Sequence, residues 1–253
     1  MRTHPPRDKS APSPHIGTMS ESLRLASYNI RKAVGLDRRR EPSRILDVIA
    51  GLEADVVALQ EADRRLGARP GVLDPAEIEA RTGMVPLEVA ANDVSLGWHG
   101  NALLVRPGVT LRGLTRLALP SLEPRGAVLA ELDSPAGPLR VLGVHLALTR
   151  AWRRRQVEAI LTSLAPLPER PTVVMGDFNE WSRLGGLAPL AREFDLLSPG
   201  RSFHAARPLA ALDRFALRGG LTMADAGVRE DRLASVASDH LPIWADLRLP
   251  ALA

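Results

Sequence analysis

The sequence contains no cysteine among its 253 residues. This absence excludes disulfide bonds, thiolate zinc sites and a cysteine nucleophile, and it suits a reducing compartment such as the cytoplasm. Lysine and aromatic residues are scarce, with two lysines, four tryptophans, four phenylalanines and one tyrosine. Long apolar runs are also missing, and no run approaches the ~20 residues that a membrane-spanning helix needs. We therefore expect a cytoplasmic protein without a transmembrane segment.

The charge balance argues against an extended nucleic-acid surface, although the isoelectric point is about 10.4. The formal net charge is only +4. Residues 1–18 hold three basic side chains and one acidic side chain, which is +2, so the rest of the chain also carries +2. The isoelectric point is high because nearly every basic residue is arginine. Since binding along a nucleic-acid backbone requires many basic contacts, a small-molecule or lipid-derived ligand is favoured over an extended nucleic acid.

The N-terminal segment differs in composition from the rest of the chain. Residues 1–18 are rich in proline, serine, histidine and arginine, and they lack the apolar centre of a secretory signal. This composition predicts a disordered tail over residues 1–20. No repeat or long linker follows, and a hydrophobic content of 45% at this length suits one large domain or two small ones. We expect a single catalytic domain over residues 21–253.

Short apolar runs alternate with amphipathic stretches along the body of the chain. Helical spacing of apolar residues predicts one helix over residues 42–52 and another around residues 157–164. Apolar runs predict strands at residues 23–29, 55–59, 102–105, 128–132, 139–144, 172–175, 213–217 and 241–247. Many strands with few helices indicate sheets covered by helices, an α/β (α+β) class. Four arginines near the start of the second helix are expected on its solvated face: Arg150, Arg153, Arg154 and Arg155.

Polar side chains that can bind a metal or transfer a proton stand at the ends of these apolar runs. They are Asn29, Glu61, His145, Asp177, Asn179, Asp239 and His240. Strand ends on a rigid sheet bring such groups together. Carboxylate and amide oxygens are hard ligands, so Asn29, Glu61 and Asp239 predict a site for Mg²⁺ or Mn²⁺. Such an ion polarises phosphoryl oxygens, while Asp177, placed off the metal, would orient or deprotonate the attacking water.

Each of these residues also has an ordinary structural interpretation. An Asn or Asp at a strand end is usually turn chemistry, and Glu61 alone would be a solvated loop carboxylate. His145 alone is more often a hydrogen-bonded structural histidine. No histidine stands at a spacing from Ser27 or Ser238 that indicates a paired base. This argues against a Ser–His–Asp hydrolase. The occurrence of all the polar residues at strand ends, in one order, favours the catalytic interpretation.

Seven short runs resemble motifs of the endonuclease/exonuclease/phosphatase superfamily, a group of metal-dependent phosphoesterases. They occur in the family's order and span most of residues 23–247. The runs are Ser27-Tyr28-Asn29-Ile30, Leu59-Gln60-Glu61, Gly100-Asn101-Ala102, Gly143-Val144-His145-Leu146, Gly176-Asp177-Phe178-Asn179, Leu212-Asp213-Arg214-Phe215 and Ser238-Asp239-His240-Leu241-Pro242-Ile243. The resemblance implies a four-layer αββα sandwich of two mixed β-sheets, with the site at one end of the sheets.

The resemblance also implies a metal site and a water-activating group. Glu61 would be the principal metal ligand, with Asn29 and Asp239 completing or supporting the site. Asp177 would activate the water or serve the leaving group. Asn179 would orient Asp177 or contact the phosphate.

The remaining roles concern the phosphate. His240 would bind and polarise it, and Asp213 would hold the His240 ring in the needed tautomer. His145 would be a general acid or a phosphate contact. Asn101 would bind the substrate phosphate or orient a histidine, and the neighbouring run Trp98-His99-Gly100 is a candidate for lining the site.

The substrate is open among three alternatives: a small or lipid-derived phosphodiester, DNA or RNA, or none in a catalytically silent binding module. An aromatic content of 4% argues against the aromatic lipid-inserting loops of sphingomyelinases. The near-neutral body argues against a nuclease, and the intact catalytic positions argue against a silent module. The run from Pro208 to Arg214 resembles small bacterial-type members of the family, whose substrates the resemblance does not fix.

Overall fold

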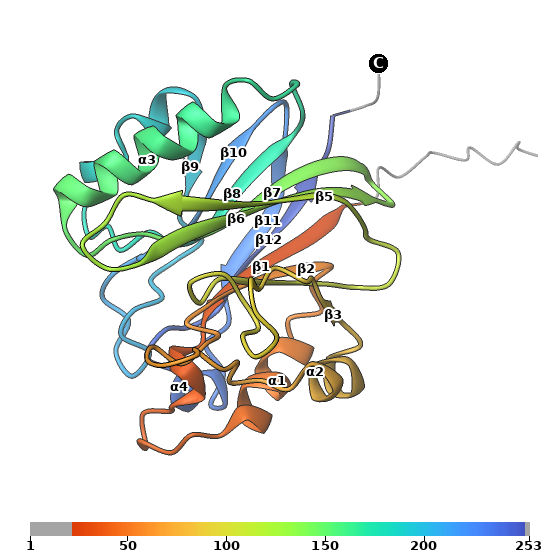
Figure 1. Ribbon diagram of the computed structural model, residues 1–253, viewed down its shortest axis with the longest axis vertical. Coiled ribbons are helices and arrows are strands. Elements are labelled where there is room, and N and C mark those ends of the chain that lie inside the picture. Colours follow the sequence, from red (N-terminus) through yellow and green to blue (C-terminus); the bar gives the residue numbers. More distant parts are fainter. Residues whose placement is uncertain (1–21, 251–253) are drawn as a thin grey trace, which may run out of the picture.

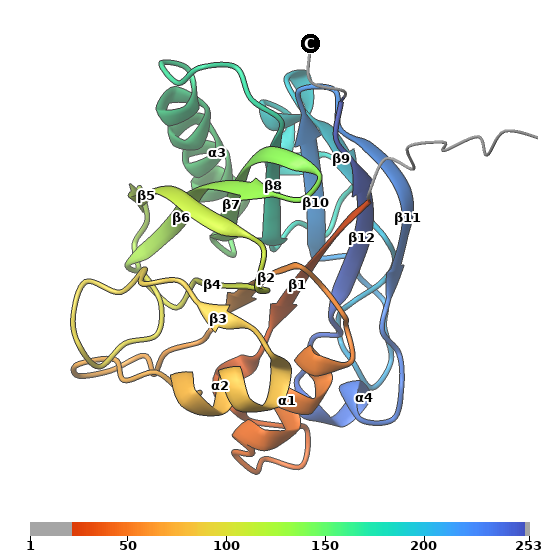
Figure 2. The same cartoon turned by 90° about the vertical axis from the view of Figure 1, so that its right-hand side faces the viewer.

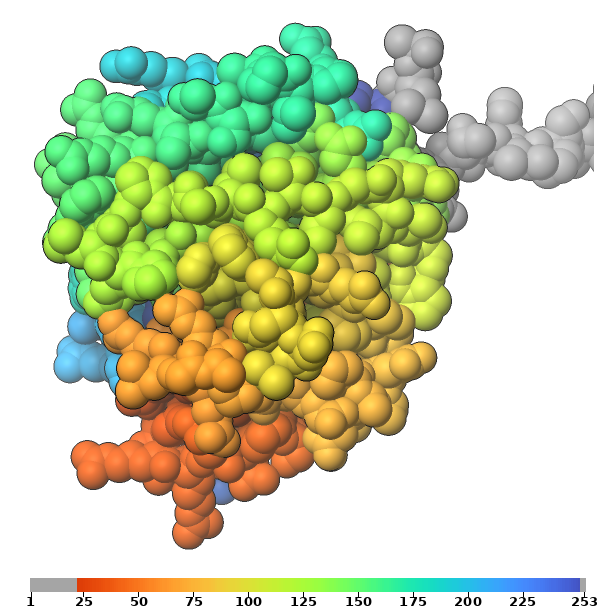
Figure 3. All heavy atoms as spheres, viewed as in Figure 1, coloured from red at the N-terminus to blue at the C-terminus, as the bar shows by residue number. Residues whose placement is uncertain are grey.

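The computed structural model describes residues 22–250, so the predicted tail, residues 1–20, lies outside the described part. Two six-stranded sheets stack face to face, and helices cover the outer face of each sheet (Figures 1 and 2). In the space-filling view, the yellow-green segment of the second sheet lies directly against the orange and yellow segments of the first sheet's side (Figure 3). The expected four-layer αββα sandwich is therefore confirmed.

The first sheet holds the N-terminal and C-terminal strands side by side at its centre. Its strand order is β11-β12-β1-β2-β4-β3. Only the pair β1 and β2 is parallel, which makes the sheet mixed. The strands are β1 (Leu23–Asn29), β2 (Val56–Gln60), β3 (Val85–Pro86), β4 (Ala102–Val105), β11 (Thr222–Val228) and β12 (Ile243–Arg248).

The second sheet has the strand order β5-β6-β7-β8-β10-β9. It is also mixed, because β7 and β8 are parallel while the other neighbours are antiparallel. The strands are β5 (Thr110–Leu119), β6 (Arg125–Ser134), β7 (Gly137–His145), β8 (Thr172–Asp177), β9 (Asp195–Leu197) and β10 (Asp213–Arg218).

The helices are short and divide between the two outer layers. α1 (Pro42–Ala50), α2 (Pro75–Thr82) and α4 (Ala234–Ala237) lie on the first sheet, and α3 (Arg150–Leu164) lies on the second (Figures 1 and 2). Proline opens both α1 and α2, where its missing N–H costs no helical hydrogen bond. Asp74 caps α2 by accepting from the N–H groups of Ala76 and Glu77.

Three apolar cores separate the four layers, because side chains alternate between the two faces of each strand. Along β1, Ala26 and Tyr28 face α1, α2 and α4, whereas Leu23 and Leu25 face the second sheet. The same alternation in the second sheet sends one set of residues inward and the other set against Val157, Ile160 and Leu164 of α3. This three-core packing holds both sheets rigid, and loops at one end of the sandwich carry the polar residues.

The predicted strands at residues 23–29 and 102–105 match β1 and β4, and the other six predicted strands overlap observed ones. The first predicted helix ends earlier than expected, at Ala50, and Leu52 is buried beyond its end. The sequence pattern missed β5 and β11 because most of their residues are exposed or half-buried, so neither has an apolar run. None of the helices within residues 22–250 combines the length and apolar character needed to cross a membrane.

Candidate active site

Three neighbouring strands of the second sheet bring three of the predicted residues together. In the strand register, His145 at the end of β7 lies beside Asp177 at the end of β8. Asp213, at the start of antiparallel β10, is the partner of Asp177 on its other side. Because parallel strands end at the same edge and β10 begins there, the three side chains meet at one end of the sandwich.

The carboxylate of Asp177 is the centre of this group. Its Oδ2 lies 3.0 Å from Nδ2 of Asn29, which donates to it across from the first sheet. The same oxygen is 3.4 Å from Nε2 of His145 and 3.7 Å from Nε2 of His240. Its other oxygen, Oδ1, accepts from the N–H of Asn179 at 2.9 Å. One buried carboxylate therefore contacts residues contributed by both sheets.

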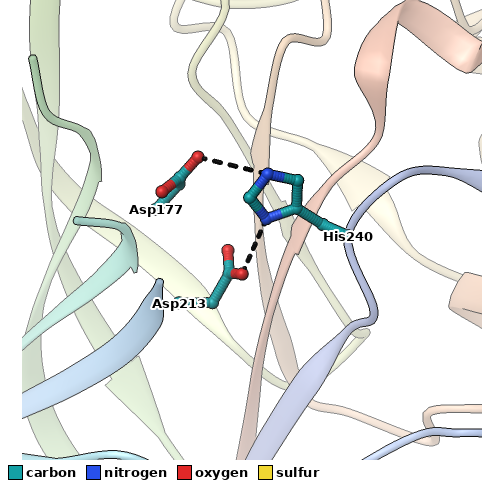
Figure 4. Close-up of side chains that lie close together, drawn as sticks. All are labelled: Asp177, Asp213 and His240. Atoms are coloured by element: carbon teal, nitrogen blue, oxygen red, sulfur yellow. Dashed lines mark hydrogen bonds and ion pairs between the residues drawn. The ribbon is translucent and has the colours of Figure 1, made fainter. Parts of the chain in front are cut away.

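His240 lies between two carboxylates (Figure 4). Its Nδ1 is 2.8 Å from Oδ2 of Asp213, and its Nε2 faces Asp177. Ser202 donates its hydroxyl hydrogen to the same Asp213 oxygen at 2.5 Å. Since Asp213 has no exposed side-chain surface, these contacts fix both the position and the tautomer of the His240 ring.

The two histidines have opposite electrostatic surroundings. Burial opposes protonation of His240, but the charges of Asp213 and Asp177 outweigh it and raise the pKa of His240 to about 10. Burial, together with the nearby cations Arg125 and Lys32, lowers the pKa of His145 well below its ordinary value. At neutral pH the site therefore holds one imidazolium and one neutral imidazole. In such a pair, His240 can donate a proton and His145 can accept one.

The surroundings of Asp177 disfavour the charged form of its carboxylate. Burial raises the pKa of Asp177, and the neighbouring charge of Asp213 acts in the same direction. The His240 cation and the hydrogen bonds from Asn179 and Asn29 oppose that rise. Asp177 is therefore a stronger base than an ordinary surface aspartate, which suits a group that takes a proton from water.

The three predicted metal ligands come from the first sheet and the turn that precedes β12. The carboxylate of Glu61 contacts Nζ of Lys32, and Oδ2 of Asp239 is 3.3 Å from Nε of Arg31. Oδ1 of Asn29 accepts from the N–H of Arg31 at 3.1 Å. Arg31 and Lys32 thus place cations against the two carboxylates that the sequence predicts as metal ligands, and the Arg31 backbone occupies the Asn29 oxygen.

Backbone torsions in the left-handed region gather around this site. Within residues 22–250, nine non-glycine residues have positive φ, and Arg31, Lys32, Glu61, His99 and Asn179 are among them. L-residues adopt this region only at a cost in free energy, which the surrounding structure must offset. Such clustering is typical of functional sites, where loop geometry is held for positioning side chains rather than for stability.

Hydrogen bonds hold the loops that carry the site residues. Asn179 donates from Nδ2 to the carbonyl of Leu146 at 2.9 Å, which joins the segments following β8 and β7. Ser238 donates to the carbonyl of Asn29 at 2.7 Å, which ties the Ser238–His240 turn to the end of β1. A Cβ on Gly176 would lie 1.9 Å from the carbonyl oxygen of Val144, so only glycine fits there.

Asn101 occupies a buried position beside the site. Its Nδ2 donates to the carbonyls of Gly126 at 2.9 Å and of Trp98 at 3.3 Å. The amide hydrogens are therefore engaged with the backbone, and Oδ1 is left without a partner. This arrangement favours a role in fixing the turn from Trp98 to Asn101, and the substrate-binding role of Asn101 stays a prediction.

One further grouping bears on metal binding. Among residues 22–250, Asp177, Asp213 and His240 form the group of three acidic or histidine side chains whose ligand atoms lie within 4.8 Å of one another. These residues differ from the predicted ligands, Asn29, Glu61 and Asp239. Two of the three, Asp213 and His240, already bond each other at 2.8 Å, and a metal on their bonded atoms would have to break that contact.

A pocket of about 250 Å³ opens beside the cluster. Glu61, Lys32 and His145 line it, as do His99 and Gly100. The candidate run Trp98-His99-Gly100 therefore reaches the pocket through His99 and Gly100. His204, a further histidine of the chain, is exposed in the loop between β9 and β10 and does not line this pocket.

The expectation that all four arginines of α3 face solvent is wrong for Arg153. Arg150, Arg154 and Arg155 are exposed, but Arg153 has a relative exposure of only 4%. Its guanidinium donates to Oε2 of Glu180 at 2.9 Å and to the carbonyls of Ala147 and Leu148. Glu180 follows Asn179 directly. The contacts of Arg153 therefore tie the loop after β8, which carries Asn179, to helix α3.

We expect Arg153→Met to lower the free energy of unfolding by about 3 kcal/mol, because the buried Glu180 carboxylate loses its charged partner and keeps only its bonds from Ser182 and Gly186. Arg154→Met is the matched control, since Arg154 is exposed and pairs only with Glu158 within its own helix. We expect the control to change stability by less than about 1 kcal/mol. Urea unfolding followed by circular dichroism measures both variants. Equal stabilities in the two variants would contradict the anchoring role.

Several residues of the site were missed by sequence reasoning. Arg31 and Lys32 follow Asn29 directly, so their closeness in sequence to a predicted ligand was an available signal. Ser202 gave no signal, because it lies in a loop 11 residues before Asp213 and belongs to no motif. Its contact with Asp213 emerges only from the tertiary structure.

Comparisons with known proteins agree with this geometry. A family model described as the endonuclease/exonuclease/phosphatase family matches residues 26–240. No curated protein matches the sequence.

Several solved structures share the fold. One is a functionally unknown conserved protein from Enterococcus faecalis, with 20% identity, a TM-score of 0.72, and coverage of 90% of this chain and 100% of that chain. A mannosyl-6-phosphatase from Bacteroides thetaiotaomicron has 17% identity and a TM-score of 0.71, covering 89% of this chain and 99% of that chain. A D. rerio TDP2 complexed with a single-strand DNA product has 17% identity and a TM-score of 0.66, with coverage of 90% and 99%. At these identities the likeness establishes the fold alone.

Proposed function

The chain belongs to the endonuclease/exonuclease/phosphatase family, and from this we propose that it is a divalent-metal-dependent phosphoesterase, with phosphodiesters as its substrates. We further propose that residues 21–253 act as one catalytic domain. The family's relatives include a protein named a phosphatase and a TDP2 with bound DNA product, which supports ester hydrolysis at phosphorus without fixing the substrate.

The observation that carries the proposal is the convergence on Asp177. A buried carboxylate whose pKa is raised lies within 3.7 Å of two histidines that differ in protonation. A purely structural carboxylate at a strand end would not require this arrangement. The combination is typical of a site that moves a proton while stabilising charge on an anionic substrate.

The residues fit a hard divalent cation. Asn29, Glu61 and Asp239 offer oxygen donors only, and Arg31 and Lys32 now neutralise the carboxylates that an incoming ion would take. This donor set is a better choice than Asp177, Asp213 and His240, where the histidine is protonated and bonded to Asp213. When bound, Mg²⁺ or Mn²⁺ supplies charge neutralisation on the phosphoryl oxygens.

The chain's own residues activate the water, bind the phosphate and transfer the proton. Asp177 holds the attacking water by Oδ2 and accepts its proton, while the N–H of Asn179 keeps Oδ1 in place. The His240 imidazolium donates from Nε2 to a phosphate oxygen, with Asp213 bonded to Nδ1 behind it. His145, neutral and 3.4 Å from Asp177, contacts the phosphate, or it takes up the proton that Asp177 has accepted from the water and then passes a proton to the leaving oxygen.

The metal requirement gives a direct test. We expect EDTA to abolish hydrolysis of bis(4-nitrophenyl) phosphate, and Mg²⁺ or Mn²⁺ to restore it. Glu61→Gln should raise the metal concentration for half-maximal activity at least tenfold, because it removes the principal charged ligand. Glu79→Gln on the exposed face of α2 is the matched control and should behave as wild type. Full activity in EDTA would contradict the proposed metal dependence.

A panel of substrates at matched metal concentration separates the remaining alternatives. It compares the aryl diester, supercoiled plasmid, RNA, phospholipid vesicles and inositol phosphates. Nicking of plasmid with a steep salt dependence would favour a nuclease, and release of a phosphorylated headgroup would favour a lipid phosphodiesterase. A chain that hydrolyses none of them would behave as a binding module.

A further inference from the structure

The pocket beside Asp177 has a basic outer wall that the proposed chemistry does not use. It lies between the segment after β2, the turn at His99, and the connection from β5 to β6. Glu61 and His145 line the pocket, and Nε2 of His145 is 3.4 Å from Oδ2 of Asp177, so a molecule held at the reaction centre can extend into it. Its lining also includes Arg64, Arg65, Arg69 and Arg125, which we call the outer wall.

The charges of this wall are only partly neutralised. Asp63 turns inward, where its carboxylate accepts from the N–H groups of Leu96 and Gly97. Glu123 is 2.5 Å from Arg65 and 3.8 Å from Arg125, which accounts for the other acidic residue of the outer wall. Arg64 and Arg69 have no ion-pair partner within the described part of the chain. The pocket lining therefore includes two arginines with no carboxylate in direct contact, and Asp63 acts on Arg69 only at longer range.

His99 adds a hydrogen-bond donor, its Nε2–H, to the residues that line the pocket. Nη1 of Arg69 lies 2.8 Å from Nδ1 of His99. A guanidinium has no acceptor atom, so Nδ1 must accept and the His99 hydrogen resides on Nε2. Burial and the neighbouring Arg69 lower the pKa of His99, which agrees with a neutral ring. The contact also orients Arg69, which is otherwise a flexible side chain.

We propose that Arg64, Arg69 and His99 form a subsite for a second anionic group, so that the substrate is a small phosphoester bearing a further phosphate or comparable anion. The inference rests on the proposed function, because the first phosphate is the one held at Asp177 and His240. A guanidinium matches phosphate geometry through paired hydrogen bonds. Each such charge-assisted contact contributes enough binding to favour the doubly anionic ligand by about tenfold or more.

A small ligand suits the pocket better than a long one. Its volume, about 250 Å³, is below the ~300–1,000 Å³ typical of pockets that enclose whole drug-sized ligands. The volume accommodates one group beyond the reacting phosphate. The near-neutral charge of the body also provides few contacts for a longer backbone.

Equilibrium binding tests the subsite without turnover. Calorimetry of the full chain in EDTA compares thymidine 3′,5′-bisphosphate with thymidine 5′-monophosphate, which differ by one phosphate. We expect wild type to bind the bisphosphate at least tenfold more tightly. The ratio should fall to about one in Arg64→Gln/Arg69→Gln and should be partly retained in Arg64→Lys/Arg69→Lys. The matched control, Arg112→Gln/Arg154→Gln, removes two exposed arginines elsewhere and should keep the wild-type ratio.

The possible outcomes separate the subsite from the catalytic proposal. Equal affinities in wild type, or an unchanged ratio in Arg64→Gln/Arg69→Gln, would overturn the subsite. A ten-nucleotide single-stranded DNA that binds over tenfold more tightly than the bisphosphate would overturn the small-substrate assignment. Failure of wild type to hydrolyse any phosphoester with Mg²⁺ or Mn²⁺ would reject the catalytic proposal, while the binding ratio still decides the subsite.

Discussion

Asp177→Asn is expected to lower kcat for phosphodiester hydrolysis by about 10³-fold, with a much smaller change in KM. The amide has the shape of the carboxylate, but it cannot accept the proton of the attacking water. Substrate binding depends on His240 and the metal site, so the loss falls on the chemical step. Steady-state kinetics with bis(4-nitrophenyl) phosphate at saturating Mg²⁺ measures both constants.

The same substitution should not destabilise the fold. Burial raises the pKa of Asp177. At pH 7 its ionised carboxylate therefore has a higher free energy in the folded protein than in the unfolded chain. Replacing it with a neutral amide removes that cost but leaves one of the donors Asn29 and Asn179 without an acceptor, so the midpoint of thermal unfolding should change little. A large fall in the midpoint would attribute the lost activity to misfolding. Wild-type kcat in the folded variant would remove Asp177 from the water-activating role.

Much of this arrangement follows from local sequence. Strand-end positions predicted that His145 and Asp177 lie near one another, the family resemblance added Asp213, and the register of β7, β8 and β10 now explains why the three meet. Gly176 also has a local cause, since no side chain fits against Val144. These features depend on short-range patterns and on the rule that parallel strands end at a common edge.

Other features depend on contacts between distant segments, which no local pattern encodes. Ser202 reaches Asp213 only because its loop folds back over the start of β10. Arg153 lies four residues before Val157, on the buried face of α3, but its pairing with Glu180 of a distant loop follows only from the tertiary structure. The charges on Glu61 and Asp239 are likewise met by Arg31 and Lys32 through left-handed backbone torsions that the composition of the turn does not reveal.

Three features of the site cost folding free energy, and each of them serves the proposed chemistry. Left-handed torsions at Glu61 and Asn179 hold side chains in fixed directions. Burial of Asp177 makes it a stronger base, and the neighbouring carboxylates make His240 a persistent cation. A fold selected only for stability would replace these groups with apolar ones, so their retention favours a catalytic use.

His240→Ala is expected to lower kcat by about 10²–10³-fold, because it removes the cation that donates to the phosphate oxygen. Asp213→Asn should also lower kcat, though by less, because the ring remains while its partner loses charge. In the double variant the loss should equal that of His240→Ala alone, since Asp213 acts through His240. Asn101→Ala, whose side chain bonds the backbone beside the site, serves as a comparison that should be additive with His240→Ala.

The pH profile separates this coupling from a structural defect. Asp213 contributes to the raised pKa of His240, so removing its charge lowers that pKa. Activity requires the imidazolium, and it is lost as pH rises through the pKa of His240. The alkaline limb of kcat against pH should therefore move to lower pH in Asp213→Asn, by about one to three units. A limb that stays in place while kcat falls would mean that Asp213 acts on the fold and does not govern the charge of His240.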